Sequence, residues 1–121
     1  SGTDAAGLAR MQRAADAGAI EAIVAALQVH PQVAGVQGVC GALGLVCSGT
    51  DAAGLARKQR AADAGGIEAI VAALQAHPQV ARVQDNGCSA MASVCSGSDA
   101  AGLARKQRAA DARMQRAADA G

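Results

Sequence analysis

Four cysteines and two histidines are the side chains whose types could bind a metal ion in this 121-residue chain. Cys40 and Cys47 are seven residues apart, and so are Cys88 and Cys95. On a helix this spacing separates the two Cα atoms by about 10 Å, whereas a disulfide needs them within roughly 7 Å. Zinc sites usually contain short Cys-x(2–4)-Cys pairs. We therefore predict no metal site and no disulfide within either pair, and interpret the cysteines as buried small hydrophobic residues.

The cysteines, the histidines and the glycine-rich stretch give little support to catalysis or phosphate binding. A nucleophilic cysteine needs a base and an orienting group in a pocket, whereas His30 and His77 each precede a proline and so mark helix ends. Gly38, Gly41 and Gly44 recur every three residues, without the strand and the G-x-G-x-x-G spacing of a dinucleotide site. Small residues in this pattern favour close contact between helices. We predict no catalytic residue and no cofactor, so the chain is expected not to be an enzyme.

Two short basic clusters could bind nucleic acid. Residues 55–60 and 103–108 both read LARKQR, with aspartates nearby on the same predicted helices, and the formal net charge of the chain is +1. Nucleic-acid binding needs a continuous basic stripe. We therefore interpret the clusters as solvated helix faces and predict no nucleic-acid partner.

The composition restricts how the core is built and where the chain works. There is no Phe, Tyr or Trp, so small aliphatic residues must supply the buried area, and we expect an isolated chain of marginal stability. No apolar run approaches the roughly 20 residues of a membrane-spanning helix, and no signal-peptide pattern is visible. The cysteine usage predicts a reducing compartment, the cytoplasm by default, with an organelle left open.

The chain is organised around a stretch that occurs twice. Residues 20–37 read IEAIVAALQVHPQVAGVQ, and residues 67–84 repeat this sequence with two differences, 47 residues later. The apolar residues follow the i, i+3, i+4, i+7 spacing of a core-facing helix, and His-Pro ends each helix. A repeat of this length predicts an array of stacked helical units.

A first helix is predicted before each copy. The motif AAGLARxQRAADA occupies residues 5–17, 52–64 and 100–112, each time after an aspartate that can cap a helix. Helices of about 4–17 and 51–64 are expected to end at glycines. After the third copy, residues 113–121 repeat residues 10–18 one for one, which predicts a single long helix of about 99–120.

A third helix is predicted after each His-Pro, from about Pro31 to Cys47 and from about Pro78 to Cys95, with the proline in its first turn. The buried side of the later copy is expected to comprise Val80, Val83, Met91 and Val94. The earlier copy lacks one residue before its first cysteine, which corresponds to a rotation of about 100°. Its glycines also make it an intrinsically poor helix.

The sequence resembles the armadillo repeat, most of all the Ala-rich type of algal and other protist proteins. The best matches are Ala-Gly-Gly-Ile at 64–67, Val-Gln at 83–84 and Gly-Cys at 87–88. The resemblance implies an all-α fold, an α-solenoid that forms a right-handed superhelix of about two and a half three-helix repeats. Repeat 1 would span 1–47, repeat 2 would span 48–95, and 96–121 would be the extended first helix of a truncated third repeat.

In the armadillo family the third helices line a concave protein-binding groove, where peptide-binding members carry a Trp and, four residues later, an Asn. These positions correspond to Ser89 and Ser93 here, and to Gly41 and Leu45 in the first repeat. The residues that hold a peptide backbone are therefore absent. The resemblance leaves as the candidate concave surface Gln79, Arg82, Asp85, Asn86, Ser89, Ser93, Gly38 and Gly41.

These features predict a non-enzymatic scaffold for protein–protein interaction, a peripheral or linker subunit or segment of a larger multiprotein assembly. Arrays usually need at least about three repeats, so the expected partners are other proteins: further repeats of its own array, a second copy, or a large assembly. The alternative is an adaptor-type module that binds a peptide in the third-helix groove.

Overall fold

The computed structural model describes residues 5–29 and 35–120, and these ranges contain helices and no strand. The described helices are α1 (Ala5–Asp16), α2 (Ala19–Val29), α3 (Val36–Val46), α4 (Ala52–Asp63), α5 (Gly66–Ala76), α6 (Ala81–Cys95) and α7 (Ala100–Ala120). The predicted all-α class is confirmed, whereas the armadillo-like superhelix and the repeat boundaries stay predictions. In this part of the chain no helix is both long and apolar enough to cross a membrane.

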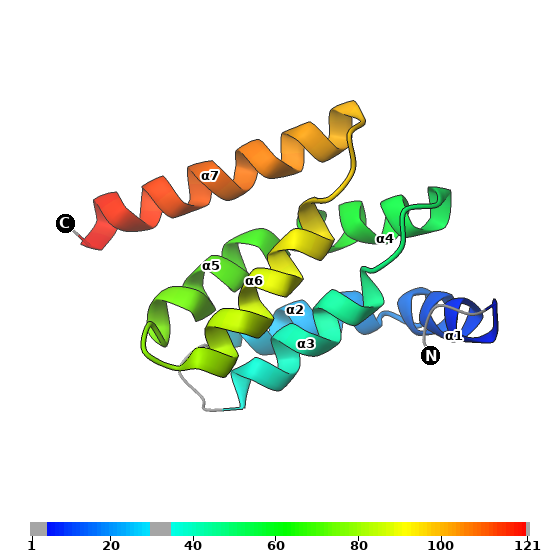
Figure 1. Cartoon of the computed structure of the whole chain (residues 1–121), viewed down its shortest axis with the longest axis horizontal. Coiled ribbons are helices and arrows are strands. Elements are labelled where there is room, and N and C mark those ends of the chain that lie inside the picture. The colour runs from blue at the N-terminus through cyan, green and yellow to red at the C-terminus, as the bar shows by residue number, and fades with distance from the viewer. Residues whose placement is uncertain (1–4, 30–34, 121) are drawn as a thin grey trace.

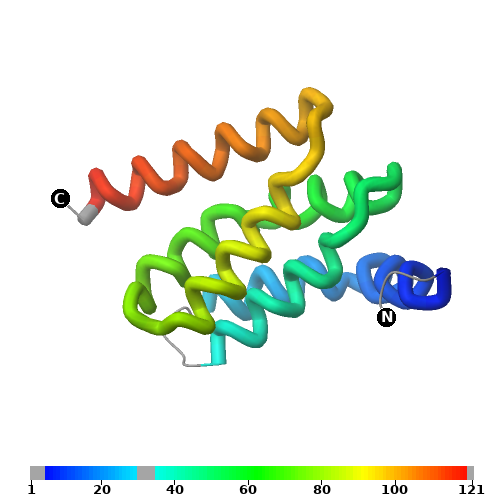
Figure 2. The backbone as a smooth tube through the Cα atoms, viewed as in Figure 1, coloured from blue at the N-terminus to red at the C-terminus, as the bar shows by residue number. Residues whose placement is uncertain are grey.

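Helices of matching sequence pack against each other. α3 lies beside α6 in the most extensive helix contact, and α2 contacts α5. α7 packs against α5 and α6 and forms the upper edge of the molecule, with α1 at the lower right (Figures 1 and 2). The described helices therefore form a stack in which the second half of the chain covers the first.

The first helices begin as the sequence predicts. Asp51 is extended and its carboxylate accepts a hydrogen bond of 2.9 Å from the backbone N–H of Gly54, which caps α4. Asp99 accepts the corresponding bond from Gly102 at 3.0 Å. α4 ends before Gly65, whose φ of 91° lets the chain turn back into α5.

The second helices supply the centre of the core, as their apolar stripe predicts. The members that are buried are Ile20, Val24 and Leu27 of α2 and Ile67, Ile70 and Val71 of α5. Ile23 and Leu74 pack against this core but stay partly exposed.

α6 starts later than predicted, and the predicted start of α3 near Pro31 lies outside the described residues. α6 begins at Ala81 and α3 at Val36, while residues 30–34 lie outside the described ranges, His30 and Pro31 among them. Pro78 is not in the first turn of α6, because the backbone passes through an extended Val80 before the helix. Val80 is 42% exposed, so its predicted burial is wrong. Val83 and Val94 are buried and Met91 is half-buried.

The extra residue in α6 changes the environment of one cysteine. Cys40, Cys47 and Cys95 are buried, but Cys88 is exposed, and all of these thiols are free. The predicted burial of Cys88 is therefore wrong. The core position one turn after Val83 belongs to Gly87, so that Cys88 lies about 100° further round the helix.

This difference predicts the thiol chemistry of the folded chain. Cys88 is expected to react quickly with a thiol reagent at mildly alkaline pH, and the buried cysteines only after unfolding. Time-resolved thiol counting on the native and denatured chain measures this. The Cys88→Ser variant should lose the fast phase entirely, whereas a second fast thiol in that variant would contradict the burial of the others.

α7 is one continuous helix of 21 residues, which confirms the long helix predicted at the end of the chain. Arg113 occupies the position that Gly65 has after α4. Because the turn at Gly65 needs a positive φ, which arginine disfavours, the helix continues at Arg113 instead of folding back.

Candidate protein-interaction surface

The solvent-facing sides of α3 and α6 form one continuous surface, which we call the α3–α6 surface. The two helices lie side by side at the front of the view in Figure 1. The residues exposed on it are Gly38, Gly41, Ala42 and Leu45 on α3 and Arg82, Asp85 and Ser89 on α6. The exposed Cys88 and Ala92 of α6 instead line a groove between α5, α6 and α7. Small side chains dominate, so the surface has low relief.

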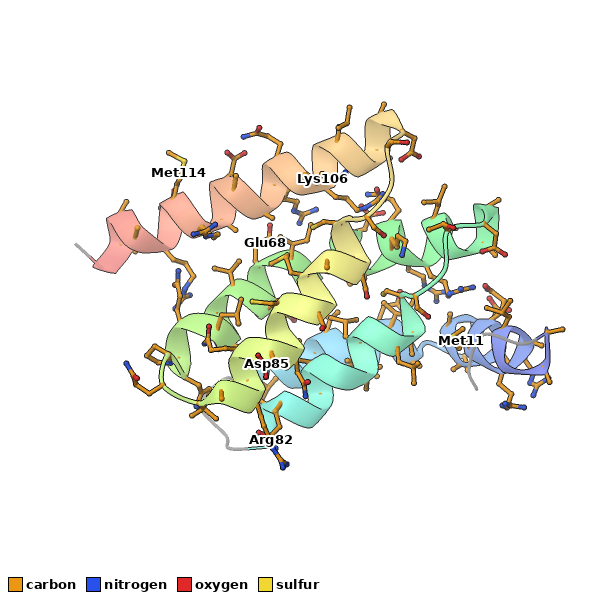
Figure 3. All side chains as sticks on the ribbon, viewed as in Figure 1. Met11, Glu68, Arg82, Asp85, Lys106 and Met114 are labelled. Carbon is orange, nitrogen blue, oxygen red and sulfur yellow. The ribbon has the colours of Figure 1, made fainter. Side chains whose placement is uncertain are left out.

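Most of the predicted candidate residues lie on this surface. Those that are exposed on it are Gly38, Gly41, Arg82, Asp85 and Ser89. Figure 3 shows Arg82 and Asp85 on the first turns of α6. Asn86 and Ser93 are half-buried, and Gln79 is exposed in the turn before α6 rather than on the helix.

Asn86 joins α6 to α3. Its Nδ2 donates a hydrogen bond of 2.9 Å to the carbonyl oxygen of Gln37. A methyl group at Gly41 would lie 3.7 Å from the same nitrogen, and one at Gly44 would lie 3.3 Å from the Cα of Ala90. The glycines of α3 thus allow α6 to approach closely, and Asn86 stabilises the helix contact instead of standing free for a ligand.

Leu45 is the large apolar residue of this surface that the candidate set omitted. Its side chain is 59% exposed, although it lies between the buried positions Leu43 and Cys47. The sequence signal was its place outside the apolar stripe of α3. Arg82 and Asp85 bring opposite charges to the first turns of α6, so the surface combines an exposed leucine on α3 with charges on α6 that balance.

The prediction that the basic clusters are solvated helix faces is wrong for three of their members, whereas Lys106 is exposed. Arg57, Lys58 and Arg105 are at most 3% exposed. The physical reason is that each finds backbone carbonyls at the end of the preceding third helix. Helix C-termini leave carbonyl groups without a partner inside the helix, and a cation there also meets the negative end of the helix dipole.

Arg57 binds the end of α3 to α4. Its Nε donates to the carbonyl of Val46 at 2.9 Å, its Nη2 to the carbonyl of Ser48 at 3.0 Å, and its Nη1 to Oε1 of Gln12 at 2.6 Å. One side chain therefore connects α1, the α3 terminus and α4. Arg105 repeats the pattern with Val94, Ser96 and Gln59, each at 2.8 Å.

Lys58 connects the ends of both third helices. Its Nζ donates to the carbonyl of Cys47 at 2.5 Å and to that of Ser93 at 2.8 Å. Burial lowers the pKa of this ammonium group. In the described residues no buried side-chain nitrogen or oxygen lacks a hydrogen-bond partner, so the cost of burying these cations is offset by hydrogen bonding.

Two ion pairs at the molecular surface join equivalent helices in the two halves of the chain. Arg60 of α4 contacts Glu21 of α2 at 2.5 Å, and Arg108 of α7 contacts Glu68 of α5 at 2.7 Å. The hydrogen bond from Arg60 lowers the pKa of the Glu21 carboxyl. Both pairs are about 40% exposed, so each adds little stability, but both fix how a first helix lies on the preceding second helix.

The buried thiols of Cys40, Cys47 and Cys95 are poorly suited to nucleophilic chemistry. Burial raises the pKa of Cys47 to about 11 and also raises the pKa values of Cys40 and Cys95. A raised pKa disfavours the reactive thiolate. Over residues 5–29 and 35–120, no three His, Cys, Asp or Glu side chains converge as metal ligands would.

Comparison with known protein families, curated proteins and solved structures found no match to this chain. The armadillo resemblance therefore stands on the sequence motifs alone.

Proposed function

We propose that this chain is a segment of an armadillo-like α-solenoid that acts as a non-enzymatic scaffold for protein–protein interaction, as a peripheral or linker part of a larger assembly. The observation that carries the proposal is the repetition of one set of bonds between units. Arg57 holds the end of α3 as Arg105 holds the end of α6. A bond set that recurs with each unit can continue along an array, in which every unit contacts only its neighbours.

The use of the polar groups supports a scaffold over an enzyme. The buried cations bond to carbonyls at helix ends, so their hydrogen-bonding capacity is used to join helices. The buried thiols have raised pKa values, which disfavours attack on a substrate. These groups serve the stacking of units and leave recognition to the surface.

The α3–α6 surface is the proposed site of interaction. Protein interfaces combine an apolar centre with a polar rim. Leu45 supplies an exposed apolar side chain, and Arg82, Asp85 and Ser89 on the neighbouring helix supply polar groups. Small residues between them allow a partner helix or strand to approach the backbone.

A matched pair of leucines tests this proposal. Leu45 on α3 and Leu103 on α7 are both 59% exposed, but only Leu45 lies on the α3–α6 surface. Proteins recovered with the wild-type chain from an extract of the source cells are identified and quantified by mass spectrometry. Leu45→Arg is expected to reduce their recovery at least roughly tenfold, since it replaces the large exposed apolar side chain of the surface with a charge.

The Leu103→Arg control should retain recovery within about twofold, as expected for a residue outside the interface. Circular dichroism of both variants verifies that the helix content is unchanged. Full recovery with Leu45→Arg, or equal loss with both variants, would contradict the assignment of this surface.

A further inference from the structure

A groove of about 830 Å³ opens between α5, α6 and α7. Its lining includes Val71, Leu74, Met91, Lys106, Ala109 and Ala110. The walls are largely apolar, with Lys106 near the end of α6 (Figure 3).

The corresponding surface in the first half of the chain is covered. Ala61 and Ala62 of α4 are fully buried, and the start of α5 lies against them, since a methyl group at Gly66 would be 2.8 Å from the Ala61 carbonyl oxygen. On α7 the equivalent Ala109 is half-buried and Ala110 is exposed. The same Ala-Ala pair is thus covered by the following second helix where it occurs in α4, and is left uncovered where it occurs in α7.

The other walls show the same contrast. Leu27 of α2 is 1% exposed, but its equivalent Leu74 of α5 is only partly buried. Leu43 of α3, three residues after Cys40, is fully buried, whereas its equivalent Met91, three residues after Cys88, is only half-buried and lines the groove. The groove is therefore the counterpart of the surface that α5 and α6 cover in the first half.

The place of a first helix next to this groove is already taken. Arg105 of α7 bonds to the carbonyls at the end of α6 as Arg57 of α4 does at the end of α3. The ion pair of Arg108 with Glu68 also matches that of Arg60 with Glu21. The described residues place no second and third helix over this groove.

Lys106 indicates where the third helix would end. Its equivalent Lys58 donates to carbonyls at the ends of two neighbouring third helices, at Cys47 and Ser93. Lys106 donates to Gly97 at 2.7 Å and is exposed. An ammonium group has three hydrogens to donate, and a helix C-terminus offers carbonyl acceptors and partial negative charge.

We propose that the α5–α6–α7 groove binds a pair of helices of the chain's own repeat type, supplied by another polypeptide. Its first helix has the IEAIV pattern and packs on Leu74 and Ala110, and its second helix ends at Lys106. The bound pair has no first helix before it, because α7 already occupies the position of that helix. This mode of binding therefore differs from head-to-tail stacking of a whole second copy of the chain. This inference rests on the proposed scaffold function and names the partner segment.

The test uses the full chain and a synthetic peptide of residues 66–95, which contains α5 and α6. Binding of the fluorescently labelled peptide is measured by anisotropy, and sedimentation velocity gives the oligomeric state of the chain alone. One peptide is expected to bind per chain. Ala110→Arg should weaken binding at least roughly tenfold, because it fills the groove and adds a charge beside Lys106.

Ala104→Arg is the matched control, since Ala104 is an exposed alanine of α7 outside the groove lining, and its binding should stay within about twofold of the wild type. Absence of peptide binding, or equal loss in both variants, would overturn the proposal. A dimer of the chain that Ala110→Arg abolishes would also overturn it, because a whole second copy would then occupy the groove. None of these results would contradict the proposed scaffold function, which the separate Leu45 experiment tests.

Discussion

Replacing Arg57 with alanine is expected to lower the free energy of unfolding by about 3 kcal/mol. The guanidinium group is 3% exposed and donates to two backbone carbonyls and to Gln12. Its removal leaves the carbonyls of Val46 and Ser48 without these donors and creates a cavity between three helices. Hydrogen bonds to charged groups contribute roughly 1.5–3 kcal/mol each, but those of one side chain do not add fully.

The chain provides its own control for this measurement. Arg10 has the same place in the motif of α1 but is exposed, so Arg10→Ala should change stability by less than about 0.5 kcal/mol. Urea unfolding followed by circular dichroism measures both variants. An equal, small effect of the two substitutions would show that Arg57 does not hold the end of α3.

Arg57 and Arg10 also show where sequence reasoning stops. Both lie in the identical run AAGLAR, yet one is buried and the other is exposed. Burial depends on the carbonyls at the end of a preceding third helix, which α4 has and which no described residue provides for α1. A local pattern could not predict this, because the deciding contacts are distant in the sequence.

Other features follow from local patterns and were therefore predictable. The i, i+3, i+4, i+7 stripe placed Ile67, Ile70 and Val71 in the core. Helical spacing likewise brought Arg82, Asp85 and Ser89 to one face of α6. The exposure of Val80 and Cys88 was not predicted, because it depends on where α6 begins and on how one extra residue rotates it.

The glycines differ in how much space surrounds them, which the sequence does not reveal. This difference predicts that a substitution by alanine has opposite effects on stability at Gly54 and at Gly38. A methyl group at Gly54 would lie 2.7 Å from the carbonyl oxygen of Gly49 and 2.8 Å from its carbonyl carbon. The backbone would have to move and would disturb the Asp51 cap of α4. Gly38 in α3 is exposed, with nothing within 4 Å of such a methyl group.

Gly54→Ala is therefore expected to destabilise the chain by about 2 kcal/mol, since the overlap outweighs the better helix propensity of alanine. Gly38→Ala should stabilise it by roughly 0.5–1 kcal/mol, because only the propensity changes. Thermal unfolding of the two variants gives the signs directly. If the loop at Gly49 lies close to the start of α4, the melting temperature falls for Gly54→Ala and rises for Gly38→Ala. An increase in both melting temperatures would contradict this close approach, because helix propensity alone would raise both.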